Sequence, residues 1–277
     1  MMRVHRLAPW HGACLSVAHG DSNRGRGSRS GGLGARALRL ARDTAAGTKA
    51  TLGWVHAAEE GEVPPALERE RLACEAAGLS AQTSCERGEA WATILRTAVA
   101  VQADLIAVGD SAGSSSALGK RRLGSTAERV LHDAPCSVLV SCGRLRDDYQ
   151  GARIVVGVDF SPHSIAAARW ARDVARAVEG HVTLVHVNPD EAAESLRSGL
   201  VSRLEQLVLS EGLPSSTEVH VLEGPVGPTL CASVDRVGAD LLFLGCRGLD
   251  RARGTNLGSV SQYCLRSAQV PVLAVRP

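Results

Sequence analysis

Aromatic residues are scarce in this chain of 277 residues, where Trp, Tyr and Phe together make up 3%. So few rings provide little material for the base-stacking surfaces of proteins that bind RNA or single-stranded DNA. Long apolar runs are absent too, whereas a membrane-spanning helix needs about 18 consecutive apolar residues. No apolar run before Gly20 has the length found in a secretory signal. We therefore expect a cytoplasmic protein, neither secreted nor held in a membrane.

Lysine is nearly absent as well, with two lysines against 29 arginines, a bias that favours a bacterial source with a GC-rich genome. The net charge of +2 gives no overall attraction to nucleic acids or membranes. The arginines are unevenly placed, however. Residues 1–42 carry eight of them and one acid, Asp21, a local charge of +7 that leaves −5 for the rest.

The eight cysteines form no C-x-x-C pair and no cluster with histidine at the spacing of a zinc site. We therefore predict no metal site. Thiols that are mostly buried, in a reducing cytoplasm, are the simplest explanation for cysteines scattered in this way.

The chain contains an internal repeat. Residues 103–109 (ADLIAVG) recur as residues 239–245 (ADLLFLG), and the Gly-Ser pair at 124–125 recurs at 258–259. Matching segments at steady offsets predict a duplicated domain.

The polar segment 143–151 between the two copies is the expected linker. It divides the chain into domain 1 at residues 1–142 and domain 2 at residues 152–277.

Each copy alternates short apolar runs with amphipathic stretches, which is typical of βαβ units around a parallel sheet. In the second copy, residues 153–159 are almost continuously apolar, as in a strand buried on both faces. Ser161 and Pro162 then supply an N-cap and a proline at the first helical position. The further expected strands are 182–187, 217–222, 240–245 and 270–275, and the helices are 164–178, 196–209, 228–237 and 259–267.

We therefore expect an α/β protein with two tandem, doubly wound, five-stranded parallel sheets of strand order 3-2-1-4-5. The first copy has a damaged opening, in which residues 14–18 are the expected first strand. Residues 20–34 follow and are too rich in Gly, Arg and Ser to pack. We interpret them as a flexible insertion at a place where the second copy has a tight turn.

The segment 245–260 of the second copy joins the fourth strand to a helix. Its glycines permit a close approach of the backbone to a ligand, and the start of the helix offers N–H groups with partial positive charge. This combination suits a phosphate, and Arg247, Arg251 and Arg253 add positive charge at the rim. With strand order 3-2-1-4-5, Asp159 faces the segment across the crevice where the order reverses, an arrangement that suits a nucleotide. Ordinary turn formation by glycine and aspartate is the alternative explanation.

Three segments of the second copy match one known pattern together. They are Val156–Ser161, Leu184–Val187 and the glycine pattern Gly245-x2-Gly248-x9-Gly258-Ser259. Together they resemble the nucleotide-binding signature of the universal stress protein family. The resemblance covers residues 13–142 and 152–277, so it indicates a tandem member with the adenine-nucleotide alpha-hydrolase-like fold.

This resemblance implies binding of ATP or AMP, with or without Mg²⁺, little or no turnover, and a role in stress adaptation. Gly157 and Asp159 would meet the ribose and adenine, and Val187 would pack on the base. Pairing through the fifth strand, residues 270–275, would form a homodimer or an intramolecular pair of the two copies. The residues expected around the phosphates are Gly245, Cys246, Arg247, Gly248, Leu249, Asp250, Arg251, Gly258, Ser259, Val260 and Ser261.

The first copy departs from the pattern. Its loop has the glycines at Gly109, Gly113 and Gly124, followed by Ser125, and each gap is one residue longer than in the second copy. Asp21 is its candidate for the acid that faces adenine. We expect this second site to be weak or lost.

Two classes of function remain open from the sequence. One is a nucleotide-binding regulator without catalysis, at most a very slow ATPase, because no general base or dedicated Mg²⁺ ligand is evident. The other is a ligand-free scaffold that binds a partner protein or nucleic acid through the Arg-rich residues 24–42. Cys246 is either a redox sensor, if N–H groups of the phosphate loop lower its pKa, or a spectator thiol.

Overall fold

A computed structural model describes residues 13–17, 51–57, 63, 65–109, 123–144, 146, 149–190, 193–248 and 257–277, with residues 13–17 and 66 described by their backbone alone. The chain divides into two compact units, of which the first ends at Ser141 and the second runs from Cys142 to Pro277. In this described part of the chain, no helix is both long and apolar enough to cross a membrane. The insertion expected at 20–34 lies outside it.

The first unit is a parallel sheet with the strand order β3-β2-β1-β4-β5. The described residues of this unit form three helices, α2 (Pro65–Ala76), α3 (Ala90–Val101) and α4 (Ser125–Asp133). The strands are β1 (Ala13–Val17), β2 (Thr51–Ala57), β3 (Ala81–Glu86), β4 (Ala103–Gly109) and β5 (Ser137–Ser141).

The second unit repeats this plan, with the strand order β8-β7-β6-β9-β10 and every pair parallel. Numbered within each unit, both orders are 3-2-1-4-5, so the predicted doubly wound α/β fold is confirmed. The strands are β6 (Arg153–Gly157), β7 (His181–Asn188), β8 (Glu218–Glu223), β9 (Leu241–Gly245) and β10 (Val272–Val275). The helices are α5 (Pro162–Ala177), α6 (Glu194–Ser210), α7 (Val226–Arg236) and α8 (Ser259–Ser267).

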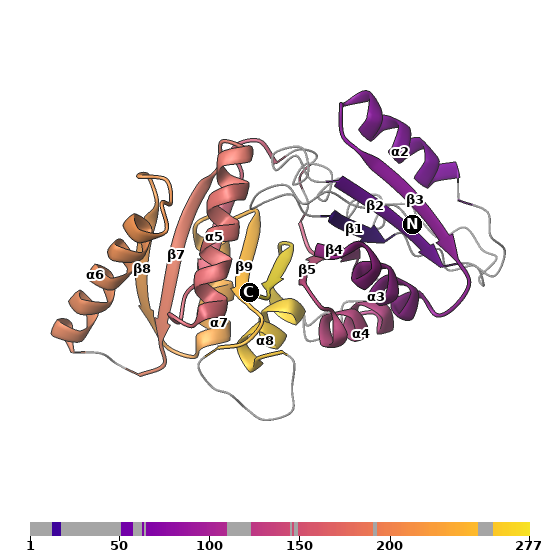
Figure 1. Cartoon of the computed structure of the whole chain (residues 1–277). Coiled ribbons are helices and arrows are strands. Elements are labelled where there is room, and N and C mark those ends of the chain that lie inside the picture. The colour runs from indigo at the N-terminus through magenta and orange to yellow at the C-terminus, as the bar shows by residue number, and fades with distance from the viewer. Residues whose placement is uncertain are drawn as a thin grey trace. The chain divides into compact units, whose positions relative to one another are not determined.

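The helices of the second unit lie on both faces of its sheet (Figure 1). Helices α5 and α6 connect strands on one side of β6 and cover one face, while α7 and α8 lie on the other face and pack against each other. The central strand β6 is therefore buried on both sides, with Ile154, Val155 and Val156 each at most 1% exposed. This explains the nearly continuous apolar run that the sequence shows there.

The predicted strand over residues 153–159 is wrong at its end, because β6 stops at Gly157. The N–H of Val158 still donates to the carbonyl of Val185, at 2.9 Å. Beyond it, the Asp159 carboxylate accepts from the N–H of Ser161 and Phe160 adopts a φ of 62°, so the chain leaves the sheet. Asp159, which the sequence predicts as a site residue, therefore lies just beyond the end of the strand.

Ser161 starts α5 as the sequence predicts. Its hydroxyl accepts from the N–H of Ser164, at 3.2 Å, and Pro162 occupies the first helical position, where a missing N–H costs nothing.

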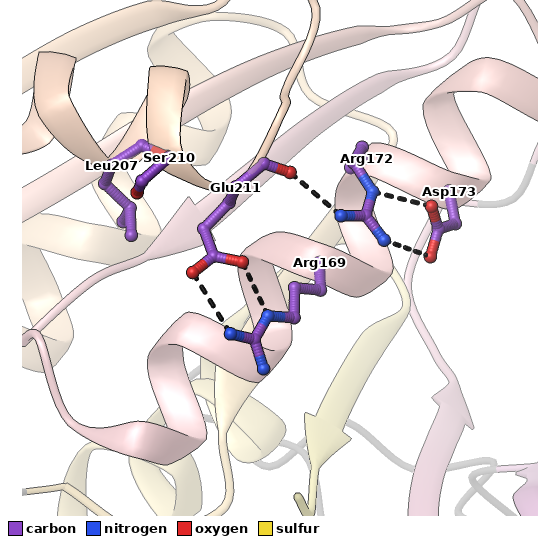
Figure 2. Close-up of polar contacts among 6 residues, drawn as sticks. All are labelled: Arg169, Arg172, Asp173, Leu207, Ser210 and Glu211. Atoms are coloured by element: carbon purple, nitrogen blue, oxygen red, sulfur yellow. Dashed lines mark hydrogen bonds and ion pairs between the residues drawn. The ribbon is translucent and has the colours of Figure 1, made fainter. Parts of the chain in front are cut away.

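Arginines of α5 hold the end of α6 (Figure 2). Arg169 donates twice to the carboxylate of Glu211, at 2.6 and 3.1 Å, and Arg172 donates to the Glu211 carbonyl and to Asp173. The hydrogen bond from Arg169 holds the pKa of Glu211 below its usual range. Two helices on the same face of the sheet are joined in this way.

The segment expected as a linker packs on the second unit. Tyr149 is 3% exposed, the Arg144 N–H donates to the Gln269 carbonyl at 2.6 Å, and Arg146 pairs with Asp240 at 3.0 Å. Gly143 has a φ of 70°, and a Cβ added there would lie 2.3 Å from the Gln269 carbonyl. Polar composition alone did not reveal these contacts.

Substitutions at two glycines of this segment distinguish the cost of backbone strain from the cost of steric overlap. Both have a positive φ, but a Cβ at Gly151 meets nothing within 4 Å whereas one at Gly143 overlaps backbone. We expect Gly151→Ala to lower the free energy of unfolding by about 1 kcal/mol, through strain alone. Gly143→Ala should lower it by about 3 kcal/mol, because backbone must also move. Urea unfolding followed by circular dichroism measures both, and equal losses would contradict the packing described.

Candidate functional site

A cavity of about 350 Å³ opens at the carboxyl ends of β6, β7 and β9 in the second unit. This is the edge at which the strand order reverses, because the chain turns to one side after β6 and to the other side after β9. The lining residues are Gly157, Val158, Asp159, Ser164, Val185, Val187, Val226, Leu230, Leu244, Gly245, Arg247, Gly248, Gly258, Ser259, Val260 and Ser261.

Asp159 forms one wall of the cavity. Its Oδ1 accepts from the N–H of Ser161 at 3.0 Å, and its own N–H donates to the Ser164 hydroxyl at 3.3 Å. These bonds set the direction of the carboxylate. Its other oxygen points across the crevice, since a Cβ added to Gly248 would lie 2.6 Å from Asp159 Oδ2.

The opposite wall is the start of α8. Gly258 is the N-cap of this helix and has no side chain with which to cap it. The first N–H groups, at Ser259, Val260 and Ser261, precede the regular i to i−4 bonds of the helix and carry its partial positive charge. This wall therefore suits an anion.

Two hydrogen bonds fix the start of α8 to the end of β9, and a third joins that end to β10. The N–H of Cys246 donates to the Val275 carbonyl at 2.8 Å, and the N–H of Gly258 donates to the Cys246 carbonyl at 2.7 Å. The Ser261 hydroxyl donates to the Gly245 carbonyl, also at 2.7 Å. The two ends of the glycine-rich segment are thereby held together, whatever path the residues between them take.

Two of the predicted site glycines are required by packing. A Cβ at Gly157 would lie 2.6 Å from a methyl of Leu244 and 2.8 Å from one of Leu230. One at Gly245 would lie 2.7 Å from the Cβ of His163 and 2.9 Å from the Ser164 nitrogen. Their small size lets α7 and α5 approach the sheet closely, which shapes the cavity.

Ten predicted site residues line this one cavity. Cys246 does not line it, although it lies in the same segment. Leu249, Asp250 and Arg251, together with Arg253, lie outside the described residues. The ten are Gly157, Asp159, Val187, Gly245, Arg247, Gly248, Gly258, Ser259, Val260 and Ser261.

Cys246 is buried, with 2% exposure. Burial raises the pKa of its thiol, despite the opposing charges of Arg276 and Arg247. A raised pKa leaves little reactive thiolate, so the structure favours a spectator thiol over a redox sensor here.

Sequence reasoning missed the apolar part of the wall, which comes from Val185 on β7, Leu244 on β9, and Val226 and Leu230 on α7. Val185 could have been found, because residues two apart on a strand share a face and Val187 was already in the predicted set. The α7 residues could not, since nothing local in the sequence places that helix over the crevice.

His163 was missed as well. It stands in the first turn of α5, against Gly245. Partial burial lowers its pKa, the charge of Arg247 lowers it further, Asp159 opposes this, and Arg276 adds to the lowering. Burial, more than the two arginines, therefore disfavours the protonated form of this imidazole.

In the first unit, some residues of the predicted second site lie in positions that correspond to those of the second unit. Gly109 ends β4, Gly124 is the N-cap of α4 without a side-chain cap, and Ser125 is the first residue of α4. Gly113 and Asp21 lie outside the described residues. Among the residues that are described, no group of three or more His, Cys, Asp or Glu is placed to hold a metal ion.

Comparison with known proteins identifies the family. The model of the universal stress protein family matches residues 29–141 and 152–276, one stretch in each unit. The chain belongs to the universal stress protein family. The two matches show a tandem arrangement of its domain, and the first begins at residue 29, after β1.

Relatives and solved structures agree with this assignment. A universal stress protein of Mycobacterium tuberculosis is 30% identical over 222 residues, which cover 74% of each chain. The crystal structure of a putative universal stress protein from Pseudomonas aeruginosa has a TM-score of 0.75 and 19% identity, and covers 96% of this chain and 93% of its own. One from Archaeoglobus fulgidus has a TM-score of 0.69 and 20% identity, and covers 95% and 98%. At these identities the structures establish the fold alone.

The lowered pKa of His163 predicts a pH dependence of stability. The folded universal stress protein binds this proton less readily than the unfolded chain, whose histidine has the ordinary pKa of 6.5. The stability contributed is therefore complete above pH 6.5 and falls as the pH drops toward the folded pKa. Urea unfolding at about pH 7.5 and about pH 5.5 should show a smaller loss of stability in His163→Gln than in the wild type. Equal losses would mean that His163 does not carry the effect.

Proposed function

We propose that this universal stress protein binds an adenine nucleotide, ATP or AMP, in the cavity of its second unit, and acts as a nucleotide-dependent regulator in stress adaptation. The observation that carries the proposal is the pairing of the two walls. A carboxylate on one side accepts hydrogen bonds, and an uncapped helix start with a glycine-rich segment on the other side receives an anion.

Each part of a nucleotide has a matching surface. Val185 and Val187 provide apolar contact for the base, and Asp159 accepts from an adenine amino group or a ribose hydroxyl. The N–H groups at the start of α8 and the charge of Arg247 face the phosphates. Mg²⁺ would reach the site on the phosphates, because the described residues offer no carboxylate cluster for it.

We expect binding without appreciable turnover. Asp159 is the one acid among the described lining residues, and its Oδ1 already accepts from the Ser161 N–H. It is thus a poor candidate for activating a water molecule, and phosphoryl transfer also needs groups that stabilise charge on the leaving side. The role that fits is regulation by occupancy, in the cytoplasm.

Pairing through fifth strands is the assembly that we propose. β10 is the last strand of the second unit's own sheet, and such a strand offers backbone N–H and C=O groups to a further strand. The partner strand is either the fifth strand of another copy or that of the same chain.

Gly248→Ala tests the nucleotide site directly. The new methyl would stand 2.6 Å from the original position of Asp159 Oδ2, so the carboxylate must move out of its place in the cavity. We expect affinity for ATP to fall about tenfold or more, the loss of at least one good hydrogen bond to a charged group. Isothermal titration calorimetry with ATP, ADP and AMP measures this.

Gly199→Ala is the matched control, because Gly199 lies within α6 and a Cβ there meets nothing within 4 Å. It should bind ATP as the wild type does. Equal affinity in Gly248→Ala and Gly199→Ala would contradict the site. No binding of any adenine nucleotide at millimolar concentration would favour the scaffold function instead. A nucleic-acid tether in residues 24–42 would show affinity that falls steeply with salt.

A further inference from the structure

Two cysteines of the second unit are in contact although they lie far apart in the sequence. Cys231 lies on α7 and Cys264 on α8, and their sulfur atoms are 3.7 Å apart, both as thiols. Cys264 is fully buried, whereas Cys231 is partly exposed. One thiol is therefore open to a small oxidant in water, and the other is sheltered directly behind it.

The contact depends on close packing of the two helices. A Cβ at Gly227 of α7 would lie 2.8 Å from Cδ1 and 2.9 Å from Cγ of Tyr263, so only a glycine permits this approach. One residue further on, the Cys264 sulfur lies 4.0 Å from the Gly227 carbonyl oxygen. The sulfurs would have to close from 3.7 Å to a bond of about 2 Å, a movement within the reach of side-chain rotation and a small helix shift.

We propose that Cys231 and Cys264 are an oxidisable pair that forms an intramolecular disulfide in the presence of hydrogen peroxide. The Cys231 sulfur attacks one peroxide oxygen and becomes a sulfenic acid, and its proton leaves with the other oxygen as water. The Cys264 sulfur then attacks the sulfenic sulfur and displaces its hydroxyl, which leaves as a second water with the Cys264 proton. Two thiols and one peroxide give one disulfide and two waters.

The order of the two steps follows from the surroundings of each thiol. The contact with Cys231, and then burial, raise the pKa of Cys264, so this thiol does not react with the oxidant first. Its part in the second step follows from its position, since its sulfur lies 3.7 Å from the Cys231 sulfur that it attacks. The more exposed Cys231 is the first to react. Its sulfenic acid is protected from further oxidation by the nearby second thiol, which condenses with it.

The bond would act on the cavity, because both helices supply its wall. Leu230 precedes Cys231 on α7, and Val260 lies one turn before Cys264 on α8. A disulfide would draw the two helices together and so move this wall of the cavity. This effect rests on the proposed function: the disulfide should weaken ATP binding about tenfold, and by linkage bound ATP should disfavour the disulfide at equilibrium by the same factor.

Peptide mapping of the full chain tests the pair without reference to nucleotides. The purified protein is treated with hydrogen peroxide, alkylated with N-ethylmaleimide and digested with trypsin. Residues 204–236 and 254–266 each hold one cysteine between arginine cleavage sites, so a disulfide joins these two peptides. We expect the joined pair in monomeric chains, with the loss of two hydrogens and reversal by dithiothreitol.

Cys231→Ser should abolish the joined peptide, and Cys85→Ser, at a similarly exposed cysteine of the first unit, should leave it unchanged. Over-oxidised Cys231 without the joined peptide in the wild type would overturn the proposal, and this result needs no variant to fold. An unchanged affinity for ATP in the oxidised protein would overturn the effect on the cavity. Reduced protein that does not bind ATP would contradict the proposed function alone, because the mapping result stands separately.

Discussion

The site depends on the position of one strand. β6 pairs in parallel with β7 on one side and β9 on the other. The chain therefore turns toward β7 after β6 and toward β10 after β9, in opposite directions along the sheet. A crevice at this edge is a consequence of the topology and needs no special residue. What the sequence adds is the chemistry of its two walls: Asp159 immediately after β6, and an uncapped helix start immediately after the glycine-rich segment that follows β9.

The glycines of this unit serve two different ends. At Gly157, Gly227 and Gly245 an added methyl would overlap a neighbouring helix or strand, so these glycines set how closely α5, α7 and α8 pack. At Gly248 the overlap is with the Asp159 carboxylate, so this glycine keeps the crevice open between its walls. The glycine pattern that resembles a single ligand signature therefore contains glycines required by packing as well as a glycine that keeps the crevice open. The same close packing at Gly227 brings Cys231 against Cys264.

Much of the fold could be predicted from the sequence where local chemistry decides it. The N-cap at Ser161, the proline at the first position of α5 and the helix over 259–267 stand as expected, because capping and apolar periodicity act over a few residues. The end of β6 could not be predicted, since its apolar run continues to Val158 while the Asp159 carboxylate turns the chain. The contribution of α7 to the cavity and the position of His163 depend on packing between distant segments, which no local pattern encodes.

The two units share one topology but differ at the opening. The family match to the first unit starts at residue 29, after β1, whereas the match to the second unit includes β6 and the Asp159 turn. In the first unit, Gly109, Gly124 and Ser125 keep the positions that Gly245, Gly258 and Ser259 hold in the second. A glycine at the end of the fourth strand and an uncapped helix start are thus present in both units.

Native mass spectrometry of the desalted protein, titrated with ATP, tests the central claim most directly because it counts bound nucleotides on each chain. One ATP per chain, bound about tenfold or more weakly in Gly248→Ala and unchanged in Gly199→Ala, is the expected result. No bound nucleotide at millimolar ATP would contradict binding in the second unit. Two per chain would contradict a weakened site in the first.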